Sequence, residues 1–355
     1  MMDSKMTRLN LFLEMTNIEQ ISDNNNKRPV DLLLRDSPPL LDKLAQPDTI
    51  SPENDVKNSL KPLQRRAIAK YITNGIVYPL INLHSTLEKS YWNTAKRCVN
   101  ELLQDGNKIT GHYCNNRWCI VCNRIRTGRM INEYLPVIKK EIEDPYFVSL
   151  TIPNVPDIEL RKTITGMTRT IIRINATFRG RKNYHQIKGI RKLECTYNTT
   201  NNDYHPHFHF ILAGETAGRH LINDWLYHYP KADRLCQDIR PADEGSLVEL
   251  FKYSTKVVTG KNFIRQGNQI ELKVHPAALD QIFRAFYGKR VFQAMGIHKL
   301  ILSEEIDEIQ AQEIEGLIHA VDVYSWEQEA SDWVNSAGAL LTGCNANETY
   351  KIKPC

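Results

Sequence analysis

The most informative stretch of this chain is YHPHFHFI, Tyr204–Ile211. Strand side chains alternate between the two faces of a sheet, so His205, His207 and His209 share one face. The residues between them point the other way, into a core. Three adjacent imidazoles repel one another when charged and need partners when buried. The pattern therefore predicts a β-strand that presents three histidines to a metal ion or to a phosphate under attack.

Two known arrangements resemble residues 205–211. In the His-hydrophobic-His (HUH) motif of single-strand DNA endonucleases, two imidazoles hold a divalent cation. In the histidine-triad signature of nucleotide hydrolases and transferases, a histidine is the nucleophile. The sequence satisfies both patterns, so this motif alone leaves both functions open.

The neighbouring segments predict an α+β domain around an antiparallel sheet. We expect strands at 147–153, 187–197 and 206–213, because these runs are short and apolar and are bounded by turn residues. The periodicity predicts helices at 157–178, 219–229, 246–257 and 276–287. A turn at 198–203 joins the second strand to the histidine strand as a hairpin, which brings Glu194 beside the histidines.

The segments outside this domain have different patterns. Residues 20–58 are rich in Asn, Pro and acids, which predicts a loosely ordered lead-in. Helical periodicity begins near Val56, resumes from Leu87 to Leu103 and stops at Gly106. A basic helix follows at about 123–142. The tail from Ser303 is acidic and is expected to be mostly helical at first.

Four of the eight cysteines lie within 25 residues. The spacing Cys114-x4-Cys119-x2-Cys122 is typical of tetrahedral zinc sites. The fourth ligand is either Cys98, which ends the preceding helix, or His112. We favour Cys98, because an all-thiolate site closes that helix onto the cysteine loop.

Charge is unevenly distributed along the 355 residues, whose formal net charge is +5. Residues 61–140 hold 14 Lys or Arg against 4 Asp or Glu, a net charge of +10. Such a block predicts a surface that contacts a polyanion. There is no run of 18 apolar residues and no signal-peptide pattern at the start, so we expect a cytoplasmic protein without a membrane span.

Glu249, Tyr253 and Lys256 form a second constellation. At spacings of four and three residues they share one face of the helix expected at 246–257. A tyrosine beside an acid and a lysine suits a phenolic nucleophile with a base and a cation nearby.

Four motifs occur in the order found in rolling-circle plasmid replication initiators: the cysteine cluster, FVSLTI at 147–152, HPHFHFIL at 205–212 and FKYSTK at 251–256. The chain thus resembles the single-tyrosine Rep proteins of the HUH endonuclease superfamily across roughly residues 90–300. Ile120 stands where that family's cysteine motif usually has proline.

The resemblance implies roles for individual residues. His207 and His209 would be the HUH pair, Glu194 an acidic third ligand, and His205 a further ligand or a supporting group. The cation would be Mn²⁺ or Mg²⁺, and the cysteines would bind a structural Zn²⁺. Tyr253 would be the nucleophile, Lys256 would neutralise charge, and Glu249 resembles the acid that activates water at termination.

The resemblance also implies the activity. Tyrosine attack on origin DNA would give a 5′-phosphotyrosine and a free 3′-hydroxyl primer. We expect double-stranded and hairpin origin DNA, a host helicase and a host polymerase as partners. The alternatives are a histidine-triad nucleotide hydrolase or transferase and a non-catalytic, zinc-dependent DNA-binding regulator.

The same reading divides the chain into four parts. These are a loosely ordered N-terminal extension (1–58), a basic helical zinc-binding subdomain (59–142), an HUH nicking domain (143–300) and an acidic C-terminal region (301–355).

Overall fold

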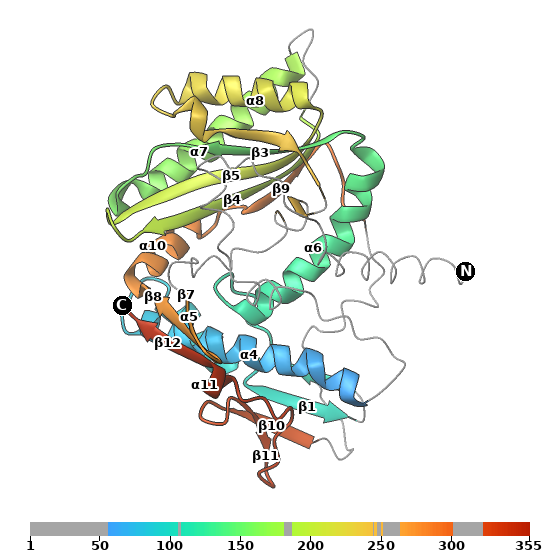
Figure 1. Ribbon diagram of the computed structural model, residues 1–355, viewed down its shortest axis with the longest axis vertical. Coiled ribbons are helices and arrows are strands. Elements are labelled where there is room, and N and C mark those ends of the chain that lie inside the picture. The colour runs from blue at the N-terminus through green and yellow to red at the C-terminus, as the bar shows by residue number, and fades with distance from the viewer. Residues whose placement is uncertain are drawn as a thin grey trace, which may run out of the picture.

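The described part of the chain folds into two lobes, and a long diagonal helix runs between them (Figure 1). The structure is a computed structural model that describes residues 56–105, 108–180, 187–243, 245–246, 250, 263–300 and 322–355. One lobe is an antiparallel sheet covered by helices, and the other is built around a long helix. The predicted α+β class is confirmed. Among the described helices, none is long and apolar enough to cross a lipid bilayer.

The first lobe contains a five-stranded antiparallel sheet with the strand order β6-β3-β5-β4-β9. Its strands are β3 (Pro145–Thr151), β4 (Gly189–Asn198), β5 (Asp203–Ala213), β6 (Asp238–Pro241) and β9 (Phe292–Met295). Two helices, α7 (Asp157–Gly180) and α8 (Glu215–His228), cover one face of this sheet. Phe208 and Phe210 are fully buried on that face, as the strand alternation predicts.

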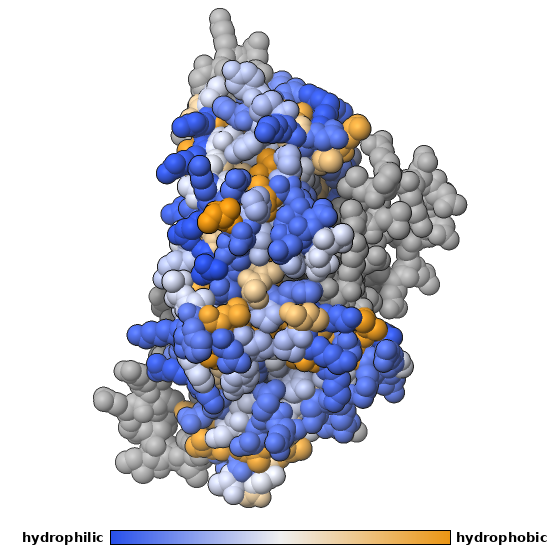
Figure 2. Space-filling view, turned by 90° about the vertical axis from the view of Figure 1, so that its left-hand side faces the viewer, coloured by the Kyte–Doolittle hydropathy of each residue, from blue (hydrophilic) through white to orange (hydrophobic). Residues whose placement is uncertain are grey.

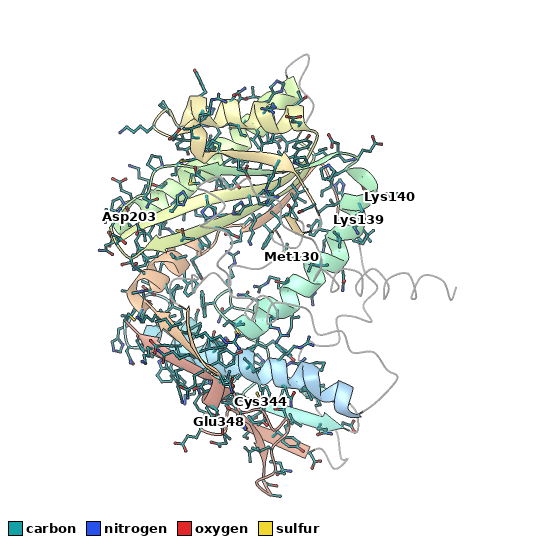
Figure 3. The ribbon with its side chains drawn as sticks, viewed as in Figure 1. Met130, Lys139, Lys140, Asp203, Cys344 and Glu348 are labelled. Atoms are coloured by element: carbon teal, nitrogen blue, oxygen red, sulfur yellow. The ribbon has the colours of Figure 1, made fainter. Side chains whose placement is uncertain are left out.

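The opposite face is apolar at one end and polar at the other. At its apolar end Phe147, Ile190 and Ile211 pack with Leu135 and Ile138 in a separate small core. These last two residues belong to the joining helix α6 (Ile120–Glu141). Figure 3 shows Met130 midway along α6 and Lys139 and Lys140 at the end nearest the sheet. The polar end of the face holds the histidines.

In the described residues, the second lobe combines three helices with two small sheets. It contains α4 (Val56–Ile81), α5 (Glu88–Arg97) and α11 (Ala346–Thr349). The first sheet has the order β11-β10-β1-β2, and the second has the order β12-β8-β7. Their strands are β1 (Glu101–Asp105), β2 (Lys108–Gly111), β7 (Phe263–Gln266), β8 (Gln269–Val274), β10 (Asp322–Glu327), β11 (Asp332–Asn335) and β12 (Tyr350–Pro354). The end of the chain therefore pairs with strands from two earlier regions, and Figure 3 labels Cys344 and Glu348 within this lobe.

Several boundaries differ from those predicted. The helix expected from Leu87 to Leu103 ends at Arg97, and residues 101–105 form β1 instead, because they pair with both β2 and β10. The region expected to be a helical zinc-binding subdomain, 59–142, therefore also contains two strands, β1 and β2. The described part of the acidic tail, 322–355, contains three strands and only one short helix, and the start of that tail lies outside the described residues. Most of the helix expected at 246–257 lies outside them too.

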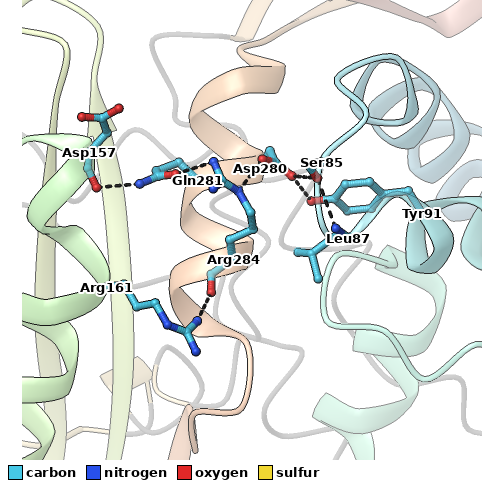
Figure 4. A network of polar contacts seen from close by, with 8 residues as sticks. All are labelled: Ser85, Leu87, Tyr91, Asp157, Arg161, Asp280, Gln281 and Arg284. Carbon is cyan, nitrogen blue, oxygen red and sulfur yellow. Dashed lines mark hydrogen bonds and ion pairs between the residues drawn. The ribbon is translucent and has the colours of Figure 1, made fainter.

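Helix α10 (Pro276–Phe286) connects the two lobes through a network of polar contacts (Figure 4). The buried carboxylate of Asp280 accepts hydrogen bonds from Ser85 Oγ (2.5 Å) and Tyr91 OH (2.8 Å). Its second oxygen accepts one from Arg284 Nε (2.7 Å). On the other side of α10, Arg161 Nη1 donates to the carbonyl of Arg284 (2.5 Å). Asp280 thus joins α10 to α5, and its neighbours join α10 to α7.

The Asp280 network yields a stability prediction. Asp280→Ala should lower the free energy of unfolding by about 2–4 kcal/mol, because it leaves the buried Tyr91 hydroxyl without its acceptor. Urea denaturation measures the change. Glu348→Ala, which removes an exposed acid in α11, is the matched control and should change stability by less than about 0.5 kcal/mol. Equal effects of the two substitutions would contradict the role given to Asp280.

Candidate functional site

Strand pairing brings two rows of polar side chains onto one face of the central sheet. In the first row Thr151, His207 and Glu194 lie directly opposite one another on β3, β5 and β4. In the second row Ser149, His209 and Lys192 lie opposite one another in the same way. Residues paired across adjacent strands have Cβ atoms about 5 Å apart, so each row forms a contiguous set.

The ligand atoms of Glu194, His207 and His209 converge. One carboxylate oxygen of Glu194, Oε2, lies 3.4 Å from His207 Nε2 and 3.7 Å from His209 Nε2. All three residues are buried, and their ligand atoms all lie within 4.8 Å of one another. Two imidazole nitrogens and one carboxylate oxygen are a donor set that suits a divalent cation, so this group can hold one.

The other ring nitrogens are already engaged. His207 Nδ1 donates to the backbone carbonyl of His205 (3.0 Å), so in the neutral ring Nε2 carries the lone pair. His209 Nδ1 is hydrogen-bonded to Ser149 Oγ (2.9 Å). Contacts of this kind fix the orientation of metal-binding histidines. Both Nε2 atoms therefore face Glu194 in defined orientations.

Lys192 forms a buried ion pair with the second carboxylate oxygen of Glu194. Sequence reasoning missed this residue, although the signal was available: Lys192 lies two positions before Glu194 on the same strand and must share its face. Ser149 was missed in the same way, because its register opposite His209 depends on the pairing of β3 with β5. A buried carboxylate needs a compensating cation, and Lys192 provides one.

His205 lies beside the group but is not one of the three converging residues. Its ring stacks on that of His207, with centroids 5.1 Å apart. Burial and the neighbouring imidazole of His207 lower the pKa of His205 to about 4, so the ring is neutral at pH 7. Its position fits a supporting group better than a further ligand.

The four cysteines form a second cluster in the other lobe. Cys98 follows α5, Cys114 follows β2, Cys119 is the N-cap of α6, and Cys122 lies in the first turn of α6. Their sulfur atoms all lie within 4.8 Å of one another. His112, the alternative fourth ligand, is exposed and uses its backbone carbonyl to accept from the amide of Val99 (2.6 Å).

The spacing of the sulfur atoms fits a tetrahedral metal site. Cys98 Sγ lies 3.5 Å from both Cys119 Sγ and Cys122 Sγ, and Cys114 Sγ lies 3.7 Å from Cys122 Sγ. Four thiolates around zinc at about 2.3 Å would have their sulfurs roughly 3.8 Å apart, whereas a disulfide bond is about 2.0 Å long. The cluster therefore suits a metal ion and not a pair of disulfides.

The charges in and around the cluster are consistent with a tetrathiolate metal site. Hydrogen bonds from Cys119, Cys122 and Cys98 lower the pKa of the Cys114 thiol, whereas burial raises the pKa of Cys119. The fully buried Lys70 of α4 donates from Nζ to the carbonyl of Ala95 (3.0 Å) close to these sulfurs. Burial lowers the pKa of Lys70, whereas the nearby cysteine thiolates raise it. A protonated Lys70 would partly balance a tetrathiolate site, whose net charge with zinc is about −2.

The three residues expected to do the chemistry on DNA, Glu249, Tyr253 and Lys256, lie outside the described residues. Their assignment as nucleophile, termination acid and neutralising cation therefore stays a prediction from the sequence.

Comparison with known proteins identifies the family. The model of the family described as "Replication protein" matches residues 107–217, a span that includes three of the four cysteines, Glu194 and all three histidines. A "Protein rep" of Staphylococcus aureus is 33% identical over 161 residues, which cover 40% of this chain and 69% of that protein. The chain belongs to the Rep family of replication proteins. The resemblance noted in the sequence is thus confirmed.

A second Rep relative comes from Streptococcus pneumoniae serotype 2 (strain D39 / NCTC 7466). It is 25% identical over 169 residues, which cover 41% of this chain and 52% of that protein. The match thus spans about half the length of this relative and about two thirds of the staphylococcal one. No solved structure matches the chain.

The cysteine cluster yields a prediction about metal and stability. Reduced, freshly purified protein should contain about one Zn²⁺ per chain. Cys122→Ser should lower both the zinc content and the free energy of unfolding, the latter by about 3 kcal/mol or more, since a structural metal contributes directly to folding. Metal analysis and urea denaturation measure the two effects.

Cys236→Ser provides the matched control, because Cys236 is exposed and outside the cluster. It should leave zinc content and stability unchanged. Zinc-free reduced protein, or full zinc retention in Cys122→Ser, would contradict the assignment.

Proposed function

We propose that this Rep protein initiates plasmid replication by nicking one strand of origin DNA with a tyrosine nucleophile. The observation that carries the proposal is the convergence of Glu194, His207 and His209 on one sheet face of a Rep-family chain. A replication protein that only bound DNA would have no use for a buried donor set of this composition.

The donor set indicates the kind of cation. Mixed imidazole and carboxylate ligation suits Mn²⁺ well and Mg²⁺ less tightly. When bound, such an ion would supply positive charge to a non-bridging oxygen of the scissile phosphate. Ser149 and the His205 carbonyl orient the two imidazoles, and Lys192 offsets the charge of Glu194.

The nucleophile in this proposal is Tyr253, within the FKYSTK motif. Its phenolate oxygen attacks the phosphorus, a tyrosine–phosphate bond forms, and the bond to the 3′ oxygen breaks. That oxygen takes up a proton and becomes the free 3′-hydroxyl that primes synthesis. A tyrosine with a pKa of about 10 is mostly protonated at pH 7, so Lys256 is assigned to stabilise the phenolate.

The remaining parts of the proposal concern the cysteine cluster and the partners. The cluster is assigned a structural Zn²⁺ that fixes α5 against the start of α6. The substrate is plasmid origin DNA, as a double strand and as a single-stranded hairpin, in the cytoplasm. A host helicase and polymerase would extend the primer. The domain boundaries after residues 58, 142 and 300 belong to the same proposal.

Membership of the Rep family removes the support for a histidine-triad nucleotide hydrolase. A non-catalytic zinc-dependent regulator would account for the cysteines, but it would leave the buried Glu194, His207 and His209 without a role.

The proposal predicts that Tyr253→Phe no longer forms the covalent protein–DNA adduct. With Mn²⁺ and single-stranded origin DNA from the replicon that carries the gene, the native protein should form an adduct that survives boiling in detergent. The variant should form at least about 10³-fold less, because only the nucleophilic oxygen is removed. Gel electrophoresis of labelled DNA measures the yield.

Tyr227→Phe is the matched control and should form adduct normally, since Tyr227 is 83% exposed on α8, across the sheet from the histidines. Undiminished adduct in Tyr253→Phe would assign the nucleophile to another tyrosine. No adduct from the native protein would favour the regulator.

Glu249 is assigned to activate water when replication terminates. Glu249→Ala should then nick and form the adduct at the native rate, but release it at least about tenfold more slowly, because release needs a general base. A pulse-chase of the labelled adduct measures its turnover. Turnover at the native rate would show that Glu249 is a solvated surface acid.

A further inference from the structure

A cavity of about 230 Å³ lies beside the candidate cation site. Three segments form its walls: the loop between Cys114 and Cys119, the end of β4 with Glu194, and the last turns of α10. Glu194 therefore belongs both to the converging donor group and to the wall of this cavity. A ligand in the cavity would lie next to the phosphate that the proposed function puts at the cation.

The cavity occupies a part of the sheet edge that β9 does not cover. Strand β9 pairs with β4 only from Gly189 to Lys192, and the amide of Leu193 donates to the carbonyl of Val291 (2.8 Å). In a regular strand Cys195 directs its backbone groups to the same side as Leu193. Cys195 also lines the cavity, so the wall offers main-chain donors and acceptors to a planar polar ligand.

The remaining walls are largely aromatic. Trp118 and Phe283 are buried with ring centroids 5.4 Å apart, and Phe286 is buried beside them. Trp118 Nε1 donates to Thr94 Oγ1 (3.0 Å), which fixes the indole in place. Tyr287, at the end of α10, is 61% exposed and lies at the cavity's open side. Rings held in this way are suited to stacking against another flat ring.

A positively charged side chain also belongs to the wall. Arg117 Nη1 donates to the carbonyl of Phe286 (3.1 Å), which holds the guanidinium against α10. Within the described residues Arg117 forms no ion pair. Its remaining N–H groups can donate to the oxygen or nitrogen atoms of a base or to a phosphate.

Beyond Tyr287 lies a cluster of cations, here called the α7–α10 basic cluster: Arg161, Arg169 and Lys289. Lys289 Nζ donates to Thr165 Oγ1 (2.8 Å), and burial and the two arginines lower its pKa. None of the three forms an ion pair with any residue in the described part of the chain. Like charges gathered without ion-pair partners repel one another, and a polyanion relieves that repulsion.

We propose that the cavity receives one unstacked base of single-stranded DNA, while the adjoining phosphates lie on the α7–α10 basic cluster. The DNA identity of the strand rests on the proposed function. The cavity is smaller than the roughly 300–1,000 Å³ typical of pockets for drug-sized ligands, which suits a single base. Holding a base here anchors the strand so that a neighbouring phosphate lies at the candidate cation site.

The test compares two labelled strands by fluorescence anisotropy in buffer without added divalent cations, so that the nicking site is not loaded and the cysteine cluster keeps its metal. One strand is a dT 12-mer, and the other is a 12-mer of abasic residues with the same phosphates. The native protein should bind the dT strand about tenfold more tightly, the contribution expected of one stacked base. Tyr287→Ala should reduce this preference at least threefold, and Tyr287→Phe should retain it.

Tyr227→Ala is the matched control, because it removes a more exposed tyrosine from α8 and should keep the native preference. Lys289→Gln and Arg169→Gln should weaken binding of both strands equally. Each should also reduce the slope of log affinity against log salt concentration by about one. Lys231→Gln, an exposed lysine after α8, should change neither strand's affinity by more than about twofold.

Two results would overturn the inference: equal affinity of the native protein for the two strands, or an undiminished preference in Tyr287→Ala. Neither would affect the nicking proposal, which the adduct assay tests separately.

Discussion

The antiparallel register of β4 and β5 is the constraint on which the candidate site depends. It pairs Glu194 with His207 and Lys192 with His209, so that a carboxylate and two imidazoles share one face. A slip of one residue would turn every one of these side chains to the opposite face. Such a slip would also put a residue with a side chain in the place of Gly189 at the start of β4. A Cβ at that position would lie 2.0 Å from the carbonyl oxygen of Ile211, so the close approach of the two backbones disfavours the slip.

The two candidate metal centres are connected through elements that both lobes share. Helix α6 begins at the cysteine cluster and ends against the apolar part of the histidine face. Helix α10 contacts α4 and α7, and its Asp280 links it to α5. A metal at the cysteines would therefore stabilise the loop that forms one wall of the cavity beside Glu194. The cysteine cluster would therefore support DNA binding through this loop, without any contact between the four cysteines and the DNA.

Much of the sheet could be predicted from the sequence, since alternation and turn residues are local signals. The strand at β5, the hairpin to β4 and the helix α7 all follow from such patterns. The helix expected through Leu103 was wrong, because β1 is stabilised by pairing with β10, more than 200 residues away. Periodicity within a short window cannot detect a partner at that distance.

The site was predictable to a similar extent. The histidines and cysteines are identified by their spacing, and Glu194 by the hairpin. Lys192 was missed although the strand alternation places it, and Lys70 could not be found, because only tertiary packing brings α4 to the cysteines. The α7–α10 basic cluster joins two segments more than 100 residues apart, which no local pattern reveals.

The central claim is that Glu194, His207 and His209 bind a divalent cation together. Anomalous diffraction from a crystal grown with Mn²⁺ tests it most directly. The account predicts one strong manganese peak within coordination distance of both Nε2 atoms and a carboxylate oxygen of Glu194, with Lys192 still close to the other oxygen. The absence of a peak there at saturating Mn²⁺, or a peak that only one of the three residues contacts, would contradict the account.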